Sequence, residues 1–395
     1  MGTQVGIVGA GPAGLVLSHL LHLEGIESVV LEARSREYVE QRVRAGVLEQ
    51  GTVDLLRDTG LADRLEREGI VHHGIEIRFD GRGHRIALTD LTGGRSIWIY
   101  GQQEVVKDLI DARLAAGAEI HFDVEDVRLE GIDSETPSLH FILGGTDRRL
   151  DCDVIAGCDG FHGVTRGSIP NGVLREYHYE FPFAWLGILA TVPPSTEELI
   201  YARHDRGFAL HSLRSPQLSR LYLQVAPNEN LNEWPDDRIW EELRIRLAME
   251  GWNLADGPII EKGVAGMRSF VVEPMQYGRL FLAGDAAHIV PATGAKGLNL
   301  AVADVRVLAR ALATWYRTGS ADLLDAYSSR CLGRVWRVQD FSAWMSSMLH
   351  RYPGDDGMQG KLQLARLEWV TSMESAARSL AENYVGLPFD DELGV

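Results

Sequence analysis

The feature that most constrains the fold is the glycine pattern near the N-terminus, Gly9-Ala-Gly11-Pro-Ala-Gly14. It follows a short apolar run and precedes a stretch with helical apolar spacing, and Ser28 to Glu32 is then predicted as a second strand. Between a strand and a helix, such glycines permit a tight turn and the close approach of a pyrophosphate. Glu32 lies where a carboxylate accepts a hydrogen bond from a ribose hydroxyl. The alternative is a tight turn without a ligand, but the well-placed carboxylate favours dinucleotide binding.

Composition and charge exclude several classes of protein. The 395 residues suffice for two or three domains, and a net charge of −17 makes nucleic acid an improbable partner. The three cysteines, Cys152, Cys158 and Cys331, show no zinc spacing, so we expect a reducing compartment and no metal site. The stretch before Arg34 lacks a basic start and is interrupted by glycines, so we expect neither a signal peptide nor a membrane span. A cytoplasmic location follows.

Two later turns each place an aspartate directly after an apolar strand, at Asp159-Gly160 and at Gly284-Asp285. An N-terminal fingerprint joined to a late Gly-Asp turn resembles the FAD-binding pattern of the aromatic hydroxylases, which implies that Asp285 binds the ribityl or pyrophosphate side of FAD. Taken alone, Asp285 would be a helix N-cap. No second GxGxxG follows a strand, so the nicotinamide co-substrate, NADPH or NADH, is expected to dock in a cleft where arginines meet its phosphates.

Six sequence blocks, spread over nearly the whole chain, extend this resemblance. They are Arg42-x-Arg44-Ala-Gly-Val-Leu-Glu49, Asp159-Gly-Phe-His162-Gly163, Glu198-Leu-Ile-Tyr201-Ala202, Arg268-Ser-Phe-Val-Val-Glu-Pro-Met275, Gly284-Asp-Ala-Ala-His-Ile-Val-Pro291 and Ala381-Glu-Asn-Tyr384-Val-Gly-Leu-Pro388. Together they resemble the 4-hydroxybenzoate 3-hydroxylase family of single-component FAD-dependent monooxygenases. The resemblance implies hydroxylation of 4-hydroxybenzoate at C3 to 3,4-dihydroxybenzoate with NAD(P)H and O2, in the degradation of aromatic compounds.

The resemblance also assigns a substrate site. Arg214 is implied to clamp the substrate carboxylate through its planar guanidinium. Tyr201 and Tyr384 are implied to bind the phenol and to pass its proton to His72, which is expected at the solvent end of the relay, titrating near neutrality. The further substrate-binding residues implied are Ser212, Tyr222, Pro291, Ala292 and Thr293.

Cofactor contacts are implied in the same way. Those for FAD are Gly9, Gly11, Ala13, Gly14, Glu32, Arg42, Arg44, Val47, Gln102, Asp159, Arg220, Asp285, Gly297, Leu298 and Asn299. Those for the nicotinamide co-substrate are Arg34, Tyr38, Arg42, Arg44, His162 and Arg268. The segment Gly294 to Asn299 is expected to lay backbone amides along the flavin ring, where they stabilise negative charge.

Two departures from the family pattern and one ambiguity leave substrate and coenzyme preference open. Ala292 replaces a proline that lends a carbonyl beside the substrate, and Ala13 replaces the serine of some relatives. Near Tyr38, Arg34 and Arg36 favour a 2′-phosphate whereas Glu37 and Glu40 oppose one. The sequence alone does not choose between NADPH and NADH.

The predicted fold is α/β, with a Rossmann-like FAD-binding domain interleaved with a β-sheet substrate domain, followed by C-terminal helices. We expect residues 1–175 to form the first part of the FAD domain, with substrate-side strands at about 70–100. Residues 176–277 are expected to form the substrate sheet, and residues 278–395 the second part of the FAD domain and the helices. A helix is predicted over 44–65, and a hairpin turn at Gly144-Gly145.

Two competing functions and the oligomeric state stay open at this point. The chain could hydroxylate another phenolic acid, for which Ala292 is the one hint, or hold flavin without catalysis. The complete set of Tyr201, Arg214 and Tyr384 argues against the second alternative. The Trp- and Met-rich C-terminal helices (Trp336, Trp344, Met345, Met348) fit either a homodimer surface or core.

Overall fold

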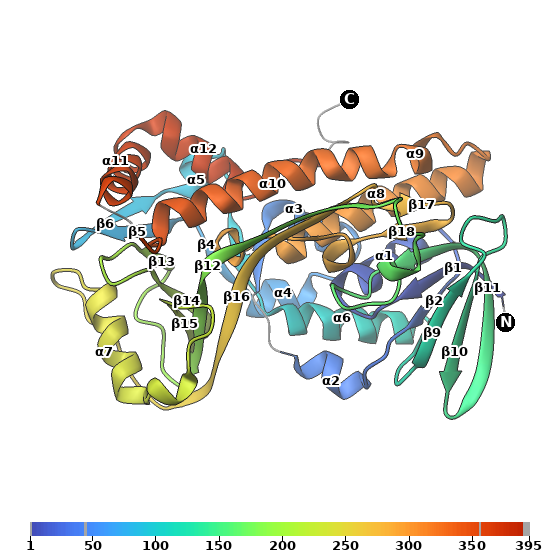
Figure 1. Ribbon diagram of the computed structural model, residues 1–395, viewed down its shortest axis with the longest axis horizontal. Helices are drawn as coiled ribbons and strands as arrows, with labels where there is room; N and C mark the ends of the chain where they lie inside the picture. Colours follow the sequence, from blue (N-terminus) through green and yellow to red (C-terminus); the bar gives the residue numbers. More distant parts are fainter. Residues whose placement is uncertain (1, 43–45, 355–356, 390–395) are drawn as a thin grey trace.

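The computed structural model describes residues 2–42, 46–354 and 357–389. Within these residues two large sheets lie side by side, and the long helix α10 (Tyr327–Leu349) runs along both of them (Figure 1). This arrangement confirms the predicted fold class of an α/β protein with C-terminal helices. No helix of the described part is long and apolar enough to cross a membrane.

The first sheet carries the dinucleotide fingerprint. Its central strand β1 (Gly2–Val8) is parallel to β2 (Ser28–Leu31) on one side and to β11 (Thr146–Gly157) on the other. The other strands of this sheet are β8 (Glu119–His121), β9 (Glu125–Glu130), β10 (Ser138–Leu143), β17 (Gln276–Tyr277) and β18 (Leu280–Leu282). The hairpin between β10 and β11 turns at Gly144 and Gly145, both with positive φ, as predicted.

Helices cover this sheet because its strands are apolar on both faces. Helix α1 (Pro12–Leu23) packs against α6 (Gln102–Ala115) and against α8 (Gly297–Thr318), which returns to this sheet from the far end of the chain. The short helices of this half are α2 (Arg36–Gln41), α3 (Gln50–Asp58), α4 (Asp63–Glu68) and α9 (Asp322–Asp325). Sequence segments nearly 300 residues apart therefore meet at the first glycine-rich turn.

The second sheet is mostly antiparallel, in the order β19-β16-β12-β15-β14-β13-β5-β6. Its strands are β5 (Ile75–Phe79), β6 (Arg82–Ile86), β12 (Arg175–Ala190), β13 (Leu199–Ala202), β14 (Ala209–Ser215), β15 (Leu218–Val225), β16 (Ile259–Glu273) and β19 (His288–Ile289). One face packs on α7 (Asp236–Arg246) and the other on α10, α11 (Met358–Ser372) and α12 (Glu374–Tyr384). The face toward these C-terminal helices contains the expected substrate residues.

Two details differ from the predictions. The helix predicted over 44–65 is only partly confirmed. Helices α3 and α4 cover 50–58 and 63–68 and are separated by Gly60 with φ +76°. Residues Val47–Glu49 instead form strand β3, which pairs with β7 (Ile97–Ile99) beside β4 (Ile70–His72). The 15-residue strand β16 is not predicted, because its Gly263 and Gly266 interrupt the alternation of side chains. The strand forms despite these two glycines because it pairs with β12 over most of its length.

Candidate active site

The glycines of the first turn have different structural reasons. Gly9 has φ +106°, and a Cβ there would lie 2.3 Å from the Cys158 carbonyl oxygen; a Cβ on Gly14 would lie 2.0 Å from the Gly9 carbonyl oxygen. These two glycines are required by the protein's own packing. Among the described residues, a Cβ on Gly11 would meet nothing within 4 Å, and no side chain caps the N-terminus of α1 that begins there. The missing side chain at Gly11 leaves room for a ligand above open backbone amides, which suits a pyrophosphate.

Glu32 follows β2 beside this turn, as expected. Its carboxylate accepts hydrogen bonds from the backbone N–H of Ala10 and of Arg34, both at 2.8 Å. These bonds fix the carboxylate next to the turn, and its remaining lone pairs can accept a hydrogen bond from a ribose hydroxyl.

The two Asp turns differ in what their side chains do. Both carboxylate oxygens of Asp159 are occupied by Thr165, through its backbone N–H at 2.9 Å and its hydroxyl at 2.5 Å. Burial raises the pKa of Asp159, and these bonds to Thr165 oppose the shift. Asp159 therefore shapes its own turn. Asp285 lies in the 3-10 turn Gly284–Ala286 just after β18, and Gly284 of this turn lies close to Ala13 and Ala301 in the N-terminal parts of α1 and α8.

The N-terminus of α8 forms a further open set of amides. Within the part of the chain that the structure describes, no side chain caps this helix, and a Cβ on Gly297 would meet nothing within 4 Å. The Asn299 side chain is fully used inside the protein, accepting from Glu49 N–H and donating to the Val47 and Ala295 carbonyls. Gly11, Glu32 and the start of α8 thus fit an extended dinucleotide cofactor such as FAD.

Lys296, which precedes α8, is a buried cation that sequence reasoning did not assign. Its ammonium donates to Glu49 Oε1 at 2.7 Å and to the carbonyl oxygens of Asn383 and Tyr384 at 2.6 and 2.9 Å. Burial lowers the pKa of Lys296, and Glu49 opposes that shift. The lysine ties α8 to the end of α12, a contact that no local motif reveals.

The expected substrate residues share one face of the second sheet. Strand pairing places Leu210 opposite both Tyr201 and Tyr222, and Ser212 opposite Arg220. Because side chains alternate along a strand, Tyr201, Ser212, Arg214, Arg220 and Tyr222 lie on the same face. Arg220 pairs there with Glu261 at 3.1 Å.

Arg214 is the most informative side chain of this face. Its Nε and Nη1 atoms are shielded from solvent and find no hydrogen-bond acceptor among the described residues. Burial lowers the pKa of Arg214, opposed by the neighbouring Tyr222 hydroxyl. Since two buried guanidinium nitrogens without an acceptor are costly, this geometry suits an anionic ligand of planar shape.

A tyrosine pair lies on the same face. The hydroxyl oxygens of Tyr201 and Tyr384 are 2.6 Å apart, and Tyr201 also donates to the Thr293 carbonyl at 3.2 Å. Both tyrosines are 1% exposed, and burial raises the pKa of each well above its ordinary value. They are therefore neutral hydroxyl groups, able to pass a proton along the pair by rotation and exchange.

His72 is not where it is expected. It ends β4, is completely buried, and neither ring nitrogen has a partner among the described residues. Burial lowers its pKa to about 4. The expectation of a solvent-facing histidine that titrates near neutrality is therefore wrong, because the His72 side chain is 0% exposed. Its part in a proton relay stays a prediction.

The segment expected to bind the nicotinamide co-substrate lies on and around α2. Arg34 and Arg42 lie over the ring of Tyr38, at 5.5 and 5.8 Å, and Tyr38 is 46% exposed. Arg36 is instead paired with Glu40 at 2.5 Å and Asp111 at 2.8 Å. Arg44 lies outside the described residues. At another edge, Arg268 lies 3.9 Å from the centre of the Phe161 ring, which contacts His162.

The other expected contacts fall beside these elements. Ala13 is in the first turn of α1, Val47 begins β3 and Gln102 begins α6. Pro291 precedes a 3-10 turn over Ala292–Gly294, between β19 and α8. Leu298 is in the first turn of α8.

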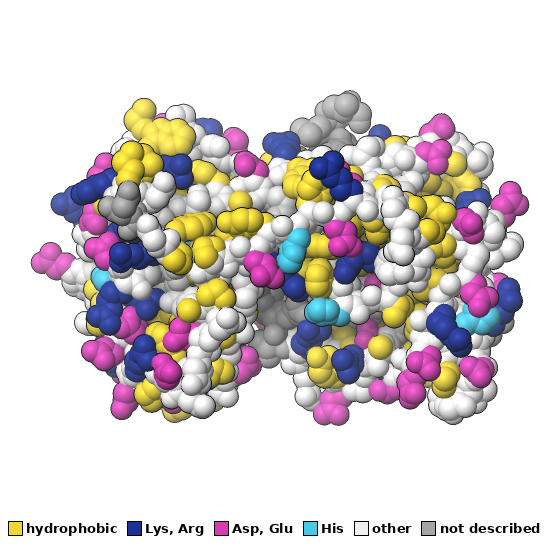
Figure 2. Space-filling model, in the orientation of Figure 1, with side chains coloured by type: hydrophobic (Ala, Val, Ile, Leu, Met, Phe, Trp, Pro, Cys, Tyr) yellow, Lys and Arg dark blue, Asp and Glu magenta, His cyan; other side chains and the backbone are white. Residues whose placement is uncertain are grey.

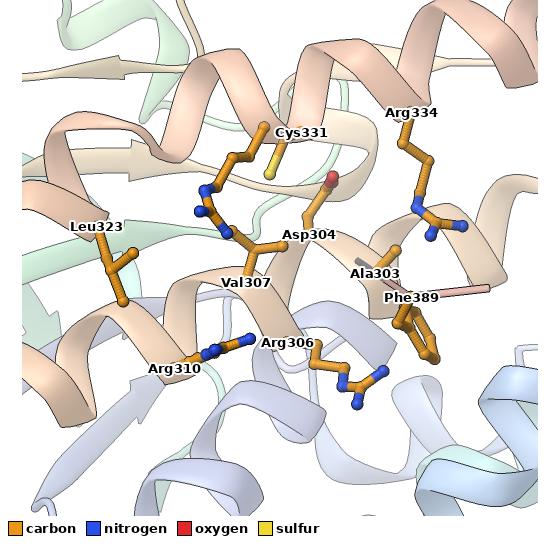
Figure 3. Close-up of a pocket in the computed structure, with 10 residues that line it drawn as sticks. Ala303, Asp304, Arg306, Val307, Arg310, Leu323, Cys331, Arg334 and Phe389 are labelled. Carbon is orange, nitrogen blue, oxygen red and sulfur yellow. The ribbon is translucent and has the colours of Figure 1, made fainter. Parts of the chain in front are cut away.

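A separate small cavity of about 40 Å³ opens between α8 and α10 (Figure 3). Its lining combines arginines with apolar side chains and one carboxylate, Asp304; the arginines are Arg306, Arg310, Arg330 and Arg334. None of the expected site residues that the structure describes lines it.

Comparison with known proteins agrees with this geometry. Residues 2–342 match the FAD binding domain family. The chain is 48% identical over 391 residues to p-hydroxybenzoate hydroxylase of Acinetobacter baylyi, covering 99% of this chain and 96% of that protein. It is 27% identical to 3-(3-hydroxy-phenyl)propionate/3-hydroxycinnamic acid hydroxylase of Mycolicibacterium gilvum, over 82% of this chain but only 56% of that longer protein. The crystal structure of p-nitrophenol 4-monooxygenase from Pseudomonas putida has the same fold, with a TM-score of 0.84 at 20% identity over 98% and 99% of the two chains.

Fold, glycine-rich turns and sequence matches together define an FAD-dependent aromatic monooxygenase. At 48% identity over nearly its entire length, the chain belongs to the p-hydroxybenzoate hydroxylase family within that class.

Proposed function

We propose that this chain hydroxylates 4-hydroxybenzoate at C3 to give 3,4-dihydroxybenzoate, using FAD, NADPH or NADH, and O2, in the breakdown of aromatic compounds. The observation that carries the proposal is Arg214, a buried guanidinium whose Nε and Nη1 lack an acceptor within the described part of the chain. It lies on the same sheet face as the Tyr201–Tyr384 pair. A carboxylate and a phenol at opposite ends of one ring match these two features.

At the carboxylate end, Arg214 holds the benzoate through two parallel N–H···O bonds, with Ser212 and Tyr222 beside it. The fork fixes the ring plane as well as its position, so the carbon next to the phenol is held in a constant place. A lysine would supply the charge without this orientation.

At the phenol end, Tyr201 takes up the phenolic proton of the substrate and passes its own proton to Tyr384. This is possible because each hydroxyl can both donate and accept a hydrogen bond. Loss of the phenolic proton increases electron density on the ortho carbon, which is the atom to be oxidised. The Thr293 carbonyl, which accepts from Tyr201, orients this hydroxyl. Pro291, Ala292 and Thr293 supply the backbone beside the ring.

FAD, when bound, supplies the reductive activation of dioxygen and the transfer of one oxygen atom to the ring. The residues that would hold it are Gly11, Glu32, Asp285 and the amides of Gly297 to Asn299. The helix N-terminus at Gly297 favours negative charge on the ring system. Arg34, Tyr38, Arg42, His162 and Arg268 are proposed for the nicotinamide co-substrate, the arginines meeting its phosphates.

The proposed domain division places residues 176–277 in the substrate unit, with β5 and β6 added from the N-terminal part. A cytoplasmic location is proposed because the three cysteines are all free and buried.

A homodimer is proposed because helix α11 and the residue after it expose apolar side chains at helical spacing, where apolar side chains gather in Figure 2. These side chains are Met358, Leu362, Trp369 and Met373. Sedimentation at several concentrations tests the dimer.

The function is tested by oxygen uptake with 4-hydroxybenzoate and each nicotinamide, with the product identified by chromatography. We expect one 3,4-dihydroxybenzoate per nicotinamide oxidised. Faster turnover of another phenolic acid would reassign the substrate, and Ala292 would be the first residue to examine. Flavin reduction without any aromatic product would overturn the proposal.

A further inference from the structure

A buried ion pair lies next to the proposed FAD turn and takes no part in the substrate site. His288 Nε2 lies 2.6 Å from Asp304 Oδ2, and the two side chains are 2% and 1% exposed. His288 begins β19 and Asp304 is in the second turn of α8. Two charged groups at this depth are costly unless they are paired and hydrogen-bonded, so the pair needs a structural or functional reason.

The same carboxylate oxygen also binds the backbone. Asp304 Oδ2 accepts the N–H of Gly284 at 3.0 Å, in addition to the His288 ring. Gly284 and His288 flank Asp285, so one oxygen atom fixes both ends of the turn that presents Asp285. Gly284 has φ +61°, and a Cβ there would lie 3.1 Å from Ala301 of α8, so the turn is held close against that helix.

His288 hydrogen-bonds to Asp304, and four arginines (Arg306, Arg310, Arg330 and Arg334) line the same cavity as this carboxylate. Cys331 of α10 points toward Asp304 (Figure 3), and burial keeps its thiol neutral by raising its pKa. Asp285 adds negative charge near His288 and, like Asp304, favours its protonated ring. Burial opposes the protonated form, but the charge and hydrogen bond of Asp304, with a smaller contribution from Asp285, raise the pKa of His288 overall.

We propose that Asp304 and His288 are positioning residues for FAD, which hold the Gly284–Asp285 turn in the conformation that presents Asp285 to the cofactor. This rests on the proposed binding role of Asp285, and is independent of which phenolic acid is hydroxylated. If the pair served folding alone, its loss would lower stability without changing the affinity of the folded apoprotein for FAD.

A double-mutant cycle on FAD affinity separates the two roles. Apoprotein of the full chain is prepared for wild type, Asp304→Asn, Asp285→Ala and the double variant, and the Kd for FAD is measured by quenching of flavin fluorescence. We expect Asp304→Asn to raise the Kd for FAD about tenfold or more, because the turn no longer holds Asp285 in place for its charge-assisted contact with FAD. In the Asp285→Ala background the same change should raise the Kd less than about threefold, because Asp304 acts through Asp285.

His288 gives a second, independent series. His288→Gln keeps a donor toward Asp304 whereas His288→Ala removes it, so the Kd for FAD should rise clearly less for glutamine than for alanine. This series also decides the matter if Asp304→Asn does not yield folded apoprotein. The matched control is Glu242→Gln on α7, which breaks a buried pair with Arg246 at 2.9 Å in the other helix layer and should lower thermal stability with no change in the FAD Kd.

The outcomes are distinct. An Asp304→Asn Kd within about twofold of wild type, or equal effects of His288→Gln and His288→Ala, overturns the positioning role. Effects of Asp304→Asn and Asp285→Ala that simply multiply also overturn it. An Asp285→Ala protein with unchanged FAD affinity shows that Asp285 does not bind the cofactor, and the inference falls with that assignment, whatever the substrate is.

Discussion

The hydroxyl oxygens of Tyr201 and Tyr384 lie 2.6 Å apart, although 183 residues separate them in the chain. Tyr201 comes from the second sheet and Tyr384 from the last turn of α12, so this contact exists only when the C-terminal helices cover the sheet. The phenol end of the proposed site is therefore assembled by tertiary packing, and several expectations follow from its geometry.

Tyr201→Phe should uncouple the reaction. The carboxylate contacts remain, so substrate still binds and nicotinamide is still oxidised, but the phenol can no longer pass its proton toward Tyr384. Loss of one strong hydrogen bond, about 1.5–3 kcal/mol, predicts about a tenfold or greater fall in hydroxylation. Hydrogen peroxide and 3,4-dihydroxybenzoate are measured per nicotinamide consumed.

Tyr316→Phe is the matched control for that variant, since it removes a tyrosine hydroxyl bound to Asp153 in the first sheet. It should stay coupled. A fully coupled Tyr201→Phe enzyme would show that the phenol is activated by another group.

Arg214→Lys should weaken substrate binding while FAD is retained. The fork-to-carboxylate pair is worth about 2–4 kcal/mol when largely desolvated, so the substrate Kd should rise about 30-fold or more. Titration of the flavin spectrum with 4-hydroxybenzoate measures it. Arg203→Lys, at a pair with the exposed Asp205, serves as control and should leave the Kd unchanged; equal Kd values for the two variants would remove Arg214 from the site.

More of the first sheet than of the candidate site could be predicted from local sequence. The glycine turn and Glu32 lie within one strand–turn–helix–strand unit, so their spacing alone predicts their neighbourhood. By contrast, the helix expected over 44–65 is replaced by β3, α3 and α4, because pairing of β3 with β7 overrides local helical periodicity.

Site residues divide in the same way. Arg214 and Tyr222 lie on adjacent strands, β14 and β15, which a strand pattern can suggest, and their side chains interact. The contacts of Lys296 and the burial of His72 are made by elements distant in sequence, and no residue spacing in the sequence predicts either of them. Resemblance to a family gives the identity of such residues, but only the packed structure gives their solvent exposure and charge state.

Gly11→Ala should weaken FAD binding without disturbing the fold. Gly11 has φ −75°, which alanine adopts freely, and the new methyl group would enter open space where a cofactor is proposed to pass. We expect the FAD Kd to rise about tenfold, with the unfolding temperature of the apoprotein unchanged or slightly higher. Gly266→Ala on β16, where a Cβ also meets nothing within 4 Å, is the control. If Gly11→Ala and Gly266→Ala bind FAD equally well, the cofactor does not pass Gly11.

Coenzyme preference should depend on the partners of Arg36. Because Arg36 is paired with Glu40 and Asp111, it is not available to a 2′-phosphate, and we expect NADH to be the better reductant. Glu40→Gln should lower the KM for NADPH several-fold by releasing Arg36 and removing a repelling charge, with little change in the KM for NADH. Gln41→Glu, which adds a charge to the same helix, should have the opposite effect on NADPH. Parallel changes for both coenzymes would place the 2′-phosphate elsewhere.

His72 should make the protein less stable in acid. Its pKa is lowered from 6.5 to about 4 by burial, so between these values the unfolded chain binds a proton that the folded chain does not. The free energy of unfolding therefore rises with pH across this window, and the stability that His72 contributes when neutral is lost as the pH falls from 6.5 toward 4. At about 1.4 kcal/mol per pKa unit, the loss amounts to about 3 kcal/mol.

Urea unfolding of wild type and His72→Asn at pH 8, 6.5 and 5 tests this expectation. The variant has no ionisable group at this position, so the difference in unfolding free energy between pH 8 and pH 5 should be smaller for it than for wild type. His211 is likewise buried with a pKa lowered to about 4, so part of the acid sensitivity should persist in His72→Asn and decrease further in a variant that also carries His211→Asn. The control is His178→Asn, at an exposed histidine of β12, which should leave the pH profile unchanged. Identical profiles for wild type and His72→Asn would mean that His72 gains a proton or a partner in the folded protein, and would restore it as a titrating member of the relay.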